Sequence, residues 1–185
     1  MTNNLLKGVN LYLIGMMGSG KTTVGQILAQ RLGYRFFDTD AVVEQAIGQS
    51  ISQFFADQGE AAFRQLETQV LAELAPYTRM TIATGGGIVL QRENWSYLRH
   101  GIILWLDVPL EHIEQRLLSD TSRPLLQGAD LQTKLQTLME QRRSLYAQAD
   151  VHLVCRPEDT PEQVADRAME QIQAALRSQD PAPET

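Results

Sequence analysis

The stretch Gly15-Met-Met-Gly-Ser-Gly-Lys21-Thr22 decides the fold, because it fits the pattern G-x-x-x-x-G-K-[ST] of a phosphate-binding loop. Its glycines allow a tight turn in which successive backbone N–H groups point inward and can bind an anion. A following helix would add the free N–H groups and the positive dipole of its N-terminus. The side chains of Lys21 and Thr22 would then contact the outer phosphates and a Mg²⁺ ion.

The residues on either side of this loop support the same interpretation. Residues 9–14 form a short β-prone run, and apolar residues recur at helical spacing from Val24 to Leu32, before Gly33 at the expected C-terminal cap. The loop therefore joins a predicted strand to a predicted helix, as a phosphate-binding loop requires. A glycine-rich turn that matches the pattern by accident is the alternative, and these flanks disfavour it.

The composition is that of an ordinary globular protein. Of 185 residues, 43% are hydrophobic and 21% are charged, and the net charge of −6 provides no overall positive field for nucleic acid. No segment approaches the ~18 apolar residues needed to span a membrane, and no signal pattern begins the chain. The single cysteine, Cys155, has apolar neighbours that indicate a buried side chain. We therefore expect one domain, in the reducing cytoplasm, without nucleic-acid or membrane partners.

Two carboxylates follow the second predicted strand, residues 34–37, in the sequence Asp38-Thr39-Asp40. The carboxyl ends of parallel strands form the ligand side of an α/β sheet. Alternation would place both carboxylates on one side if the chain stays extended there. One of them could instead cap the helix predicted over residues 41–47, with Asp40 as the candidate. A capping role does not explain both.

Further along, charged side chains and glycines occur in unusual local patterns. Predicted helices over residues 50–58 and 60–75 are separated by Gly59, and the second carries Arg64 and Glu67 three residues apart. Taken alone, this pair is best interpreted as an exposed ion pair of about 0.3–0.5 kcal/mol.

Three consecutive glycines, residues 85–87, follow a predicted strand over residues 80–83. They allow close approach of the backbone to a ligand, with a plain flexible turn as the alternative.

The rest of the chain continues the alternation of strands and helices. Strands are predicted over residues 102–106 and 151–155. Helices are predicted over residues 91–99, from Pro109 onward, over 131–146, and from Pro161 to about Arg177. The polar connection 119–130 is interpreted as a mobile lid, or else as a passive surface loop. Five strands alternating with helices predict an α/β fold with a parallel sheet covered on both faces. We expect a single domain over residues 1–178 and a disordered tail, 179–185.

These blocks together resemble the shikimate kinase family, over about residues 9–175. The resemblance implies a three-layer, nucleoside-monophosphate-kinase-like P-loop fold with strand order 2-3-1-4-5, a lid, and substrate-binding helices over about residues 41–75. It also implies transfer of the γ-phosphoryl of ATP to the 3-hydroxyl of shikimate, toward chorismate and the aromatic amino acids. The matching blocks are the phosphate loop, Asp38-Thr39-Asp40, Gly59-Glu60 with Phe63-Arg64 and Glu67, Thr84-Gly85-Gly86-Gly87, Arg123-Pro-Leu-Leu, and Arg142 before Leu145-Tyr146.

The resemblance implies roles on the ATP side. Thr22 would bind Mg²⁺ directly, with Asp38 holding it through water, while Lys21 and Arg123 would neutralise charge on the transferring phosphoryl. Arg116 would stack near the adenine. Family members often carry an adenine-lining arginine after the last strand, and Arg156 is near that place, but the following residues shift the register and leave this contact open. The expected ATP site is Gly18, Ser19, Gly20, Lys21, Thr22, Thr23, Arg116 and Arg123.

The acceptor side follows from the chemistry of shikimate, whose carboxylate calls for arginine and whose hydroxyls call for a carboxylate. By resemblance, Arg64 and Arg142 hold the substrate carboxylate, although Arg143 adjoins Arg142 and only spacing separates them. Asp40 accepts the ring hydroxyls and is the best candidate for the 3-hydroxyl proton, with Asp38 as the other. Glu67 would orient Arg64. Backbone groups would come from Gly85, Gly86 and Gly87.

Two other functions compete with this one. A gluconate or nucleoside-monophosphate kinase would share the phosphate loop and lid, but would not need this set of aspartate and arginines. A non-catalytic nucleotide-binding module would predict a damaged loop or a missing carboxylate, and neither is seen. We expect a monomer, because no second apolar stripe is left over for an interface.

Overall fold

The computed structural model describes residues 5–119 and 130–179, and its centre is a five-stranded parallel sheet. The strand order is β2-β3-β1-β4-β5, and every neighbouring pair is parallel. This confirms the predicted order 2-3-1-4-5. The strands are β1 (Leu11–Ile14), β2 (Arg35–Asp38), β3 (Met80–Ala83), β4 (Ile102–Asp107) and β5 (Val151–Val154).

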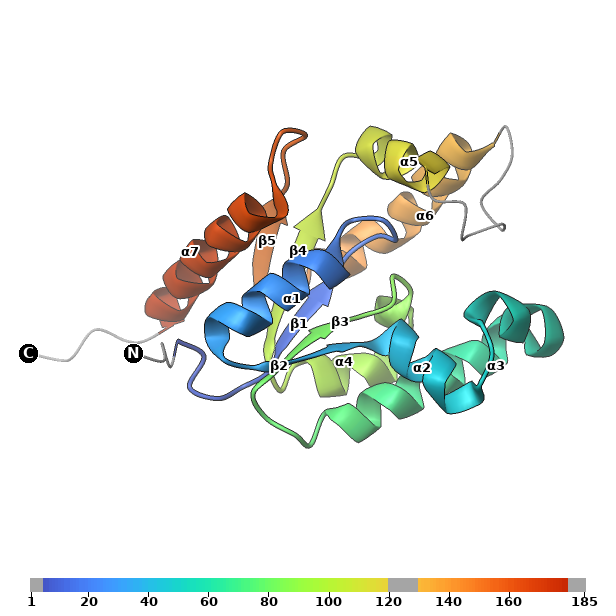
Figure 1. The fold of residues 1–185 in the computed structure, drawn as a ribbon, viewed down its shortest axis with the longest axis horizontal. Coiled ribbons are helices and arrows are strands. Elements are labelled where there is room, and N and C mark those ends of the chain that lie inside the picture. Colours follow the sequence, from blue (N-terminus) through green and yellow to red (C-terminus); the bar gives the residue numbers. More distant parts are fainter. Residues whose placement is uncertain (1–4, 120–129, 180–185) are drawn as a thin grey trace, which may run out of the picture.

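Helices connect successive strands and cover both faces of the sheet, as parallel strands require. Figure 1 shows α1 and α7 in front of the sheet and α4 and α6 behind it, which makes three layers. The helices are α1 (Lys21–Leu32), α2 (Thr39–Ile47), α3 (Ile51–Leu74), α4 (Arg92–Leu98), α5 (Leu110–Ser119), α6 (Leu131–Tyr146) and α7 (Pro161–Gln179), with a 3₁₀ turn, η1 (Ile88–Leu90).

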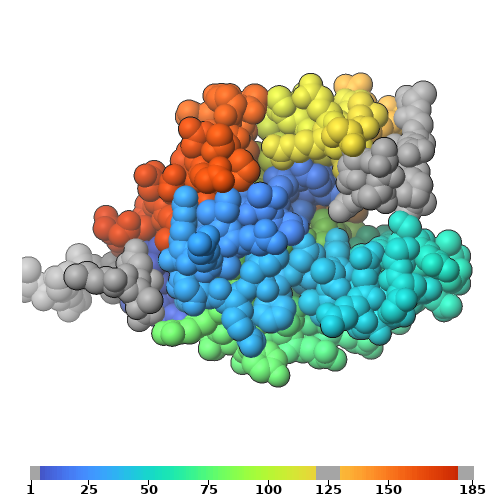
Figure 2. Space-filling view, viewed as in Figure 1, coloured from blue at the N-terminus to red at the C-terminus, as the bar shows by residue number. Residues whose placement is uncertain are grey.

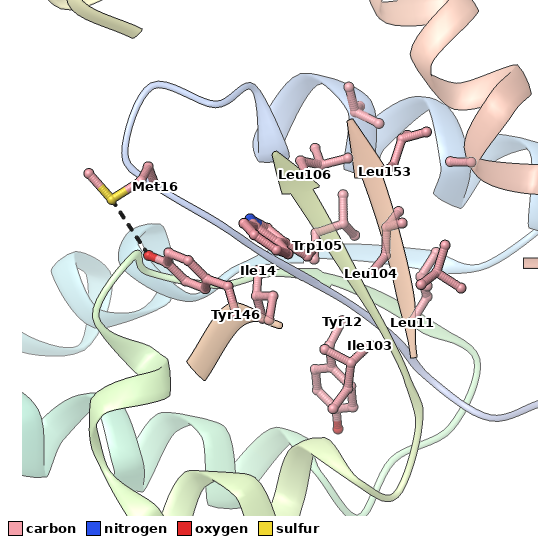
Figure 3. Packing of buried hydrophobic residues seen from close by; sticks show 14 of the residues in the cluster. Leu11, Tyr12, Ile14, Met16, Ile103, Leu104, Trp105, Leu106, Tyr146 and Leu153 are labelled. Carbon is pink, nitrogen blue, oxygen red and sulfur yellow. Dashed lines mark hydrogen bonds between the residues drawn. The ribbon is translucent and has the colours of Figure 1, made fainter. Parts of the chain in front are cut away.

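The hydrophobic core lies on the inner strands of the sheet, above all on β1 and β4. Every residue of β1 is buried, and β4 carries four consecutive buried residues, so both strands are continuous apolar runs. Trp105 of β4 stacks on Tyr146 of α6, with ring centroids 5.7 Å apart, and Figure 3 shows both rings among the surrounding core side chains. This packing fixes the end of α6 against the sheet, beside the loop that follows β1.

A smaller apolar cluster lies outside the sheet, between α2 and α3, and is built on Val43, Phe63 and Val70. Figures 1 and 2 show these helices projecting beyond one end of the sheet. Gly59 interrupts α3 with φ 80° and ψ 174°, a backbone conformation that suits glycine. The predicted break between two helical segments is therefore confirmed, and the second segment carries Arg64 and Glu67.

The structure corrects several local predictions. Helix α2 begins at Thr39, and its N-cap is Asp38 rather than Asp40. The turn η1 was not predicted. The lid expected over residues 119–130 and the tail 179–185 lie almost wholly outside the described residues. Within residues 5–119 and 130–179, no helix has both the length and the apolarity to cross a bilayer.

Candidate functional site

The phosphate loop between β1 and α1 has the backbone that its glycines permit. Gly15, Gly18 and Gly20 have φ values of 141°, 73° and 89°. A side chain at Gly15 would place its Cβ 2.7 Å from the backbone oxygen of Leu106, so the loop lies tightly on β4. Nζ of Lys21 donates to the carbonyl oxygens of Gly15 (2.9 Å) and Met16 (2.7 Å), which folds its ammonium group back over the loop. The loop therefore concentrates backbone donors and one cation around a small concavity.

Helix α1 begins directly on this loop, and its N-terminus faces the same concavity. Its N-cap, Gly20, has no side chain that could accept a hydrogen bond from the first turn. The N–H groups of that turn and the helix dipole are therefore directed at the space above the loop, which favours an anion.

Asp38 links the phosphate loop to the start of α2. Its Oδ1 accepts hydrogen bonds from the backbone N–H groups of Asp40 (3.0 Å) and Ala41 (3.4 Å), which is the N-cap of α2. Its Oδ2 accepts a hydrogen bond of 2.6 Å from the Thr22 hydroxyl. One oxygen of Asp38 therefore caps α2, the role that the sequence had offered to Asp40, and the other reaches the phosphate loop. The role of Asp38 toward Mg²⁺ stays a prediction.

The hydroxyl and carboxylate of Thr22 and Asp38 suit Mg²⁺. This ion prefers oxygen ligands and is usually held by one or two protein groups together with phosphates and water. No group of three or more His, Cys, Asp or Glu side chains within the described ranges could form an all-protein metal site. The two oxygen donors of Thr22 and Asp38 fit a Mg²⁺ ion whose other ligands are phosphates and water.

Across the sheet edge, Arg64 is held by two carboxylates of α3. Its Nη1 lies 2.5 Å from Oε2 of Glu67, and its Nη2 lies 3.1 Å from Oε1 of Glu60. Only 1% of the Glu67 side chain and 12% of the Arg64 side chain are exposed, so this is not the exposed pair that the spacing alone suggested. Burial raises the pKa of Glu67, opposed by the charge of Arg64 and reinforced by that of Asp40.

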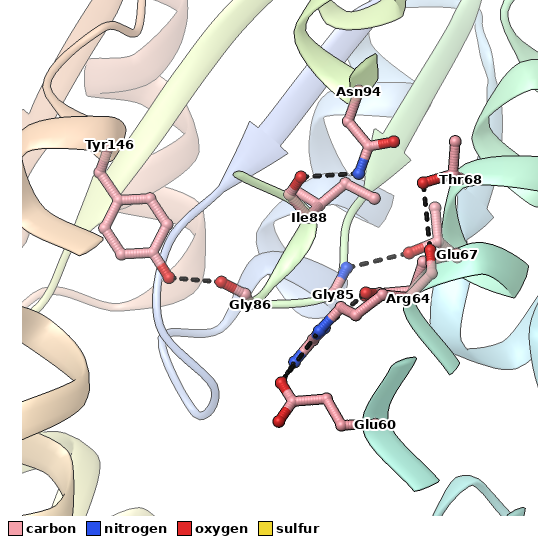
Figure 4. Close-up of polar contacts among 10 residues, drawn as sticks. Glu60, Arg64, Glu67, Thr68, Gly85, Gly86, Ile88, Asn94 and Tyr146 are labelled. Carbon is pink, nitrogen blue, oxygen red and sulfur yellow. Dashed lines mark hydrogen bonds and ion pairs between the residues drawn. The ribbon is translucent and has the colours of Figure 1, made fainter. Parts of the chain in front are cut away.

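The three glycines after β3 lie beside these charged groups, and Figure 4 shows Gly85 next to Arg64 and Glu67. A Cβ atom at Gly85 would lie 2.5 Å from Oε1 of Glu67 and 2.7 Å from Oδ1 of Asp40, and one at Gly87 would overlap the guanidinium of Arg64. The absence of side chains therefore allows two carboxylates and a guanidinium to converge on one stretch of backbone.

Helix α6 brings a second guanidinium to the same glycines. Arg142 is 5% exposed, and a Cβ atom at Gly86 would lie 3.5 Å from its Nη1. Its Nε is buried and has no hydrogen-bond partner among the described residues. Arg143 is the exposed neighbour, 60% accessible and 4.0 Å from Asp107. The geometry thus separates the two adjacent arginines, which spacing alone could not do.

A cavity of about 480 Å³ lies over the phosphate loop and the neighbouring strand ends. Lys21 and Thr22 line it together with Asp38, Asp40 and Gly86. Its other end lies between α5 and α7, where Nη1 of Arg116 donates to the Gly18 carbonyl oxygen at 3.1 Å. That end is lined by Val108, Arg116, Leu117, Cys155, Arg156, Asp159, Pro161 and Val164.

The turn at this end contains residues that the sequence reasoning missed. Asp159 accepts hydrogen bonds from the backbone N–H of Arg156 at 2.7 Å and from Nη1 of Arg167 at 2.6 Å. Arg167 also donates to the carbonyl oxygen of Val154, which ties α7 to the end of β5. No local pattern marks this clamp, because its members come together only when α7 packs against β5. Arg156 itself lines the cavity, although the sequence left its position open.

The structure therefore brings most of the predicted site residues into one region. The phosphate-loop residues, Asp38, Asp40 and Arg116 surround the cavity, and the two arginines and Glu67 surround the glycines at its edge. Their catalytic and binding roles stay predictions. Arg123, predicted to arrive from the lid, lies outside the described residues. The hydroxyl of Tyr146 donates to the carbonyl oxygen of Gly86 at 2.6 Å, a contact that the sequence did not predict.

Comparisons with known proteins identify the family. The sequence model described as shikimate kinase matches residues 17–173. A shikimate kinase from a Nostoc species is 58% identical over 175 residues, which cover 95% of this chain and 97% of the relative. A shikimate kinase from Microcystis aeruginosa is 54% identical, with 96% and 94% covered.

Solved structures agree with the sequence matches. Shikimate kinase from Acinetobacter baumannii in complex with shikimate superposes with a TM-score of 0.84 at 36% identity, covering 97% of this chain and 99% of that one. A gluconokinase from Sinorhizobium meliloti, at 14% identity and a TM-score of 0.58, shares the fold alone. The chain therefore belongs to the shikimate kinase family.

Proposed function

We propose that this chain transfers the γ-phosphoryl of ATP to the 3-hydroxyl of shikimate, giving shikimate 3-phosphate and ADP. One observation carries the proposal: the phosphate loop and Asp40 line the same cavity, and Arg64 and Arg142 approach the glycines at its edge. A phosphate donor and a small hydroxylated carboxylate could therefore be held side by side, which is the arrangement that phosphoryl transfer requires.

On the donor side, the loop and Lys21 hold the phosphates. Binding of ATP would draw the Lys21 ammonium from the loop carbonyls toward the outer phosphates, where a positive charge is needed as the bond to the leaving group breaks. The Thr22 hydroxyl and the Asp38 carboxylate would hold Mg²⁺, which neutralises phosphate charge when it is bound. The adenine would occupy the end of the cavity near Arg116 and the turn at Arg156.

On the acceptor side, the guanidinium groups of Arg64 and Arg142 would bind the carboxylate of the substrate. Arg64 is held in place by Glu67, so it loses little conformational freedom on binding. Arg142 has a buried Nε that a ligand oxygen could satisfy. Asp40 is close to the glycines and lines the donor cavity, so its carboxylate can accept the proton of the attacking 3-hydroxyl.

The resemblance to the family also implies a role for the predicted lid, residues 119–130. Arg123 would neutralise charge on the transferring phosphoryl, and we expect Arg123→Ala to lower kcat at least ~10²-fold, as loss of a transition-state donor does. A near-normal kcat in this variant would remove Arg123 from the mechanism.

We also propose that residues 1–178 form one kinase domain that works as a cytoplasmic monomer. Light scattering at assay concentration tests the oligomeric state, and a dimer mass would contradict the proposal.

The position of the transferred group tests the proposed chemistry most specifically. The product formed from ATP and shikimate is isolated, and phosphorus–proton coupling in its NMR spectrum locates the phosphoryl group. We expect coupling to the proton on C3 only. Coupling to the proton on C4 or C5 would contradict the proposed placement of Asp40 beside the 3-hydroxyl, even if shikimate is a substrate.

A further inference from the structure

The last residue of α6, Tyr146, connects the two glycine loops of the site. It is completely buried, and its hydroxyl donates to the carbonyl oxygen of Gly86 at 2.6 Å. The same oxygen lies 3.8 Å from Sδ of Met16, which belongs to the phosphate loop. Figure 4 shows the first contact and Figure 3 the second. A single hydroxyl therefore touches the loop proposed to hold the donor and the loop proposed to hold the acceptor.

The two loops are also packed directly on each other at this point. A Cβ atom at Gly86 would lie 3.3 Å from the backbone nitrogen of Met17 and 3.4 Å from the carbonyl oxygen of Gly15. Such spacing leaves little room for either backbone to shift. The distance between the loops, and with it the distance between donor and acceptor, therefore depends on the conformation of Gly86.

The hydrogen bond from Tyr146 restrains that conformation. Because a trans peptide is planar, its N–H points opposite to its carbonyl. Fixing the Gly86 carbonyl toward Tyr146 directs the N–H of Gly87 away from α6. Gly87 also borders the Arg64 guanidinium. Since glycine has unusual backbone freedom, a run of three needs an outside restraint to keep one conformation.

Aromatic stacking restrains the ring of Tyr146. It stacks on Trp105, which in turn stacks on His152 with centroids 4.0 Å apart and an interplanar angle of 8°. Arg142 lies one helical turn before Tyr146, so the two side chains share a face of α6. The Arg142 charge lowers the pKa of Tyr146, although burial has the larger effect and raises it overall, so the hydroxyl keeps its proton.

We propose that Tyr146 is a positioning residue for the acceptor site: its hydroxyl holds the Gly86 carbonyl and thereby sets the glycine backbone against the phosphate loop. The inference rests on the proposed function, because it assigns shikimate to the space beside these glycines. A purely structural role would require only the ring, which fills the core against Trp105. The hydroxyl and the ring can be separated experimentally.

Tyr146→Phe removes the hydroxyl and keeps the ring. We expect KM for shikimate to rise about tenfold, as for the loss of one buried hydrogen bond, while KM for ATP changes less than about twofold. The matched control is Tyr12→Phe. Tyr12 is also completely buried, but its hydroxyl points away from Met16 and Tyr146 in Figure 3. We expect the control to leave both KM values unchanged.

Steady-state kinetics on both variants, with thermal unfolding of each, decide the outcome. A selective rise in KM for shikimate in Tyr146→Phe alone supports the proposal. An unchanged KM overturns it, and so does an equal loss of ATP and shikimate binding or a failure to fold, since Tyr146 would then be a core residue only. The wild-type protein is assayed in parallel. If the wild-type protein does not turn over shikimate, the proposed function is contradicted. The KM values of the variants relative to wild type test the role of Tyr146 separately.

Discussion

Replacing Arg64 by alanine separates substrate binding from nucleotide binding. Charge-assisted hydrogen bonds contribute about 1.5–3 kcal/mol. Loss of the Arg64 contact to the substrate carboxylate should therefore weaken shikimate binding by about 10- to 150-fold. Lys21 and Thr22 line a cavity that Arg64 does not border, so ATP binding should change little. Isothermal titration with each ligand measures both affinities.

The same substitution should destabilise the fold, because it leaves Glu67 buried without its partner. Only 1% of the Glu67 side chain is exposed, and removing one member of such a pair costs about 3 kcal/mol. The double variant Arg64→Ala/Glu67→Gln removes both charges. It should recover much of the urea stability without recovering shikimate affinity. This double variant is the control that distinguishes a lost substrate contact from a damaged fold.

The pH dependence of the single variant provides a further check. Burial raises the pKa of Glu67 above its ordinary value of 4.5, and Arg64 opposes that rise, so the pKa should rise further in Arg64→Ala. The folded state then keeps a proton that the unfolded chain releases. The free energy of unfolding should fall as pH increases from about the ordinary pKa to the raised one, and level off above it. Equal losses of ATP and shikimate affinity, or restored shikimate binding in the double variant, would refute this reasoning.

Three other substitutions or treatments probe different parts of the site. Gly85→Ala would place Cβ 2.5 Å from Oε1 of the pinned Glu67, and should lower stability by about 1–3 kcal/mol and raise KM for shikimate; an unchanged melting temperature would contradict this. Asp38→Asn keeps the cap of α2 but removes the charge beside Thr22, so the Mg²⁺ concentration for half-maximal activity should rise about tenfold while the melting temperature holds; an unchanged Mg²⁺ requirement would argue against Asp38 as a ligand. Burial raises the pKa of Cys155 from 9.0 to about 11, so below pH 9 its alkylation should run at least ~100-fold slower than that of a free thiol, and rapid labelling at pH 7 would contradict the buried placement.

The parallel α/β fold and the phosphate loop were predictable because local patterns encode them, whereas the strand order followed only from the family resemblance. The phosphate loop needs glycines and a lysine at fixed spacing, and β4 is a continuous apolar run. The triple glycine and the arginines could be identified in the sequence, but local patterns did not predict their positions relative to one another. Gly85 lies between Asp40 and Glu67 only because β2, α3 and β3 meet at one sheet edge.

The errors have similar physical causes. Asp38 and Asp40 are chemically identical, and only the starting residue of α2 decides which one caps it. The clamp of Asp159 by Arg167 depends on the packing of α7 against β5. No role was predicted for Tyr146, because an aromatic residue at the end of a helix gives no sign of what its hydroxyl will contact. Contacts between distant segments require the folded chain.

The central claim is that this site phosphorylates shikimate, and a coupled ADP-release assay tests it most directly. The protein is assayed with ATP and Mg²⁺ against shikimate, gluconate and cytidine monophosphate at equal concentrations. We predict shikimate-dependent ADP release with kcat/KM at least ~10²-fold above that for either other acceptor, since neither presents a carboxylate and ring hydroxyls in the spacing of this site. ADP release that does not depend on shikimate, or that is faster with gluconate or the nucleotide, would contradict the account.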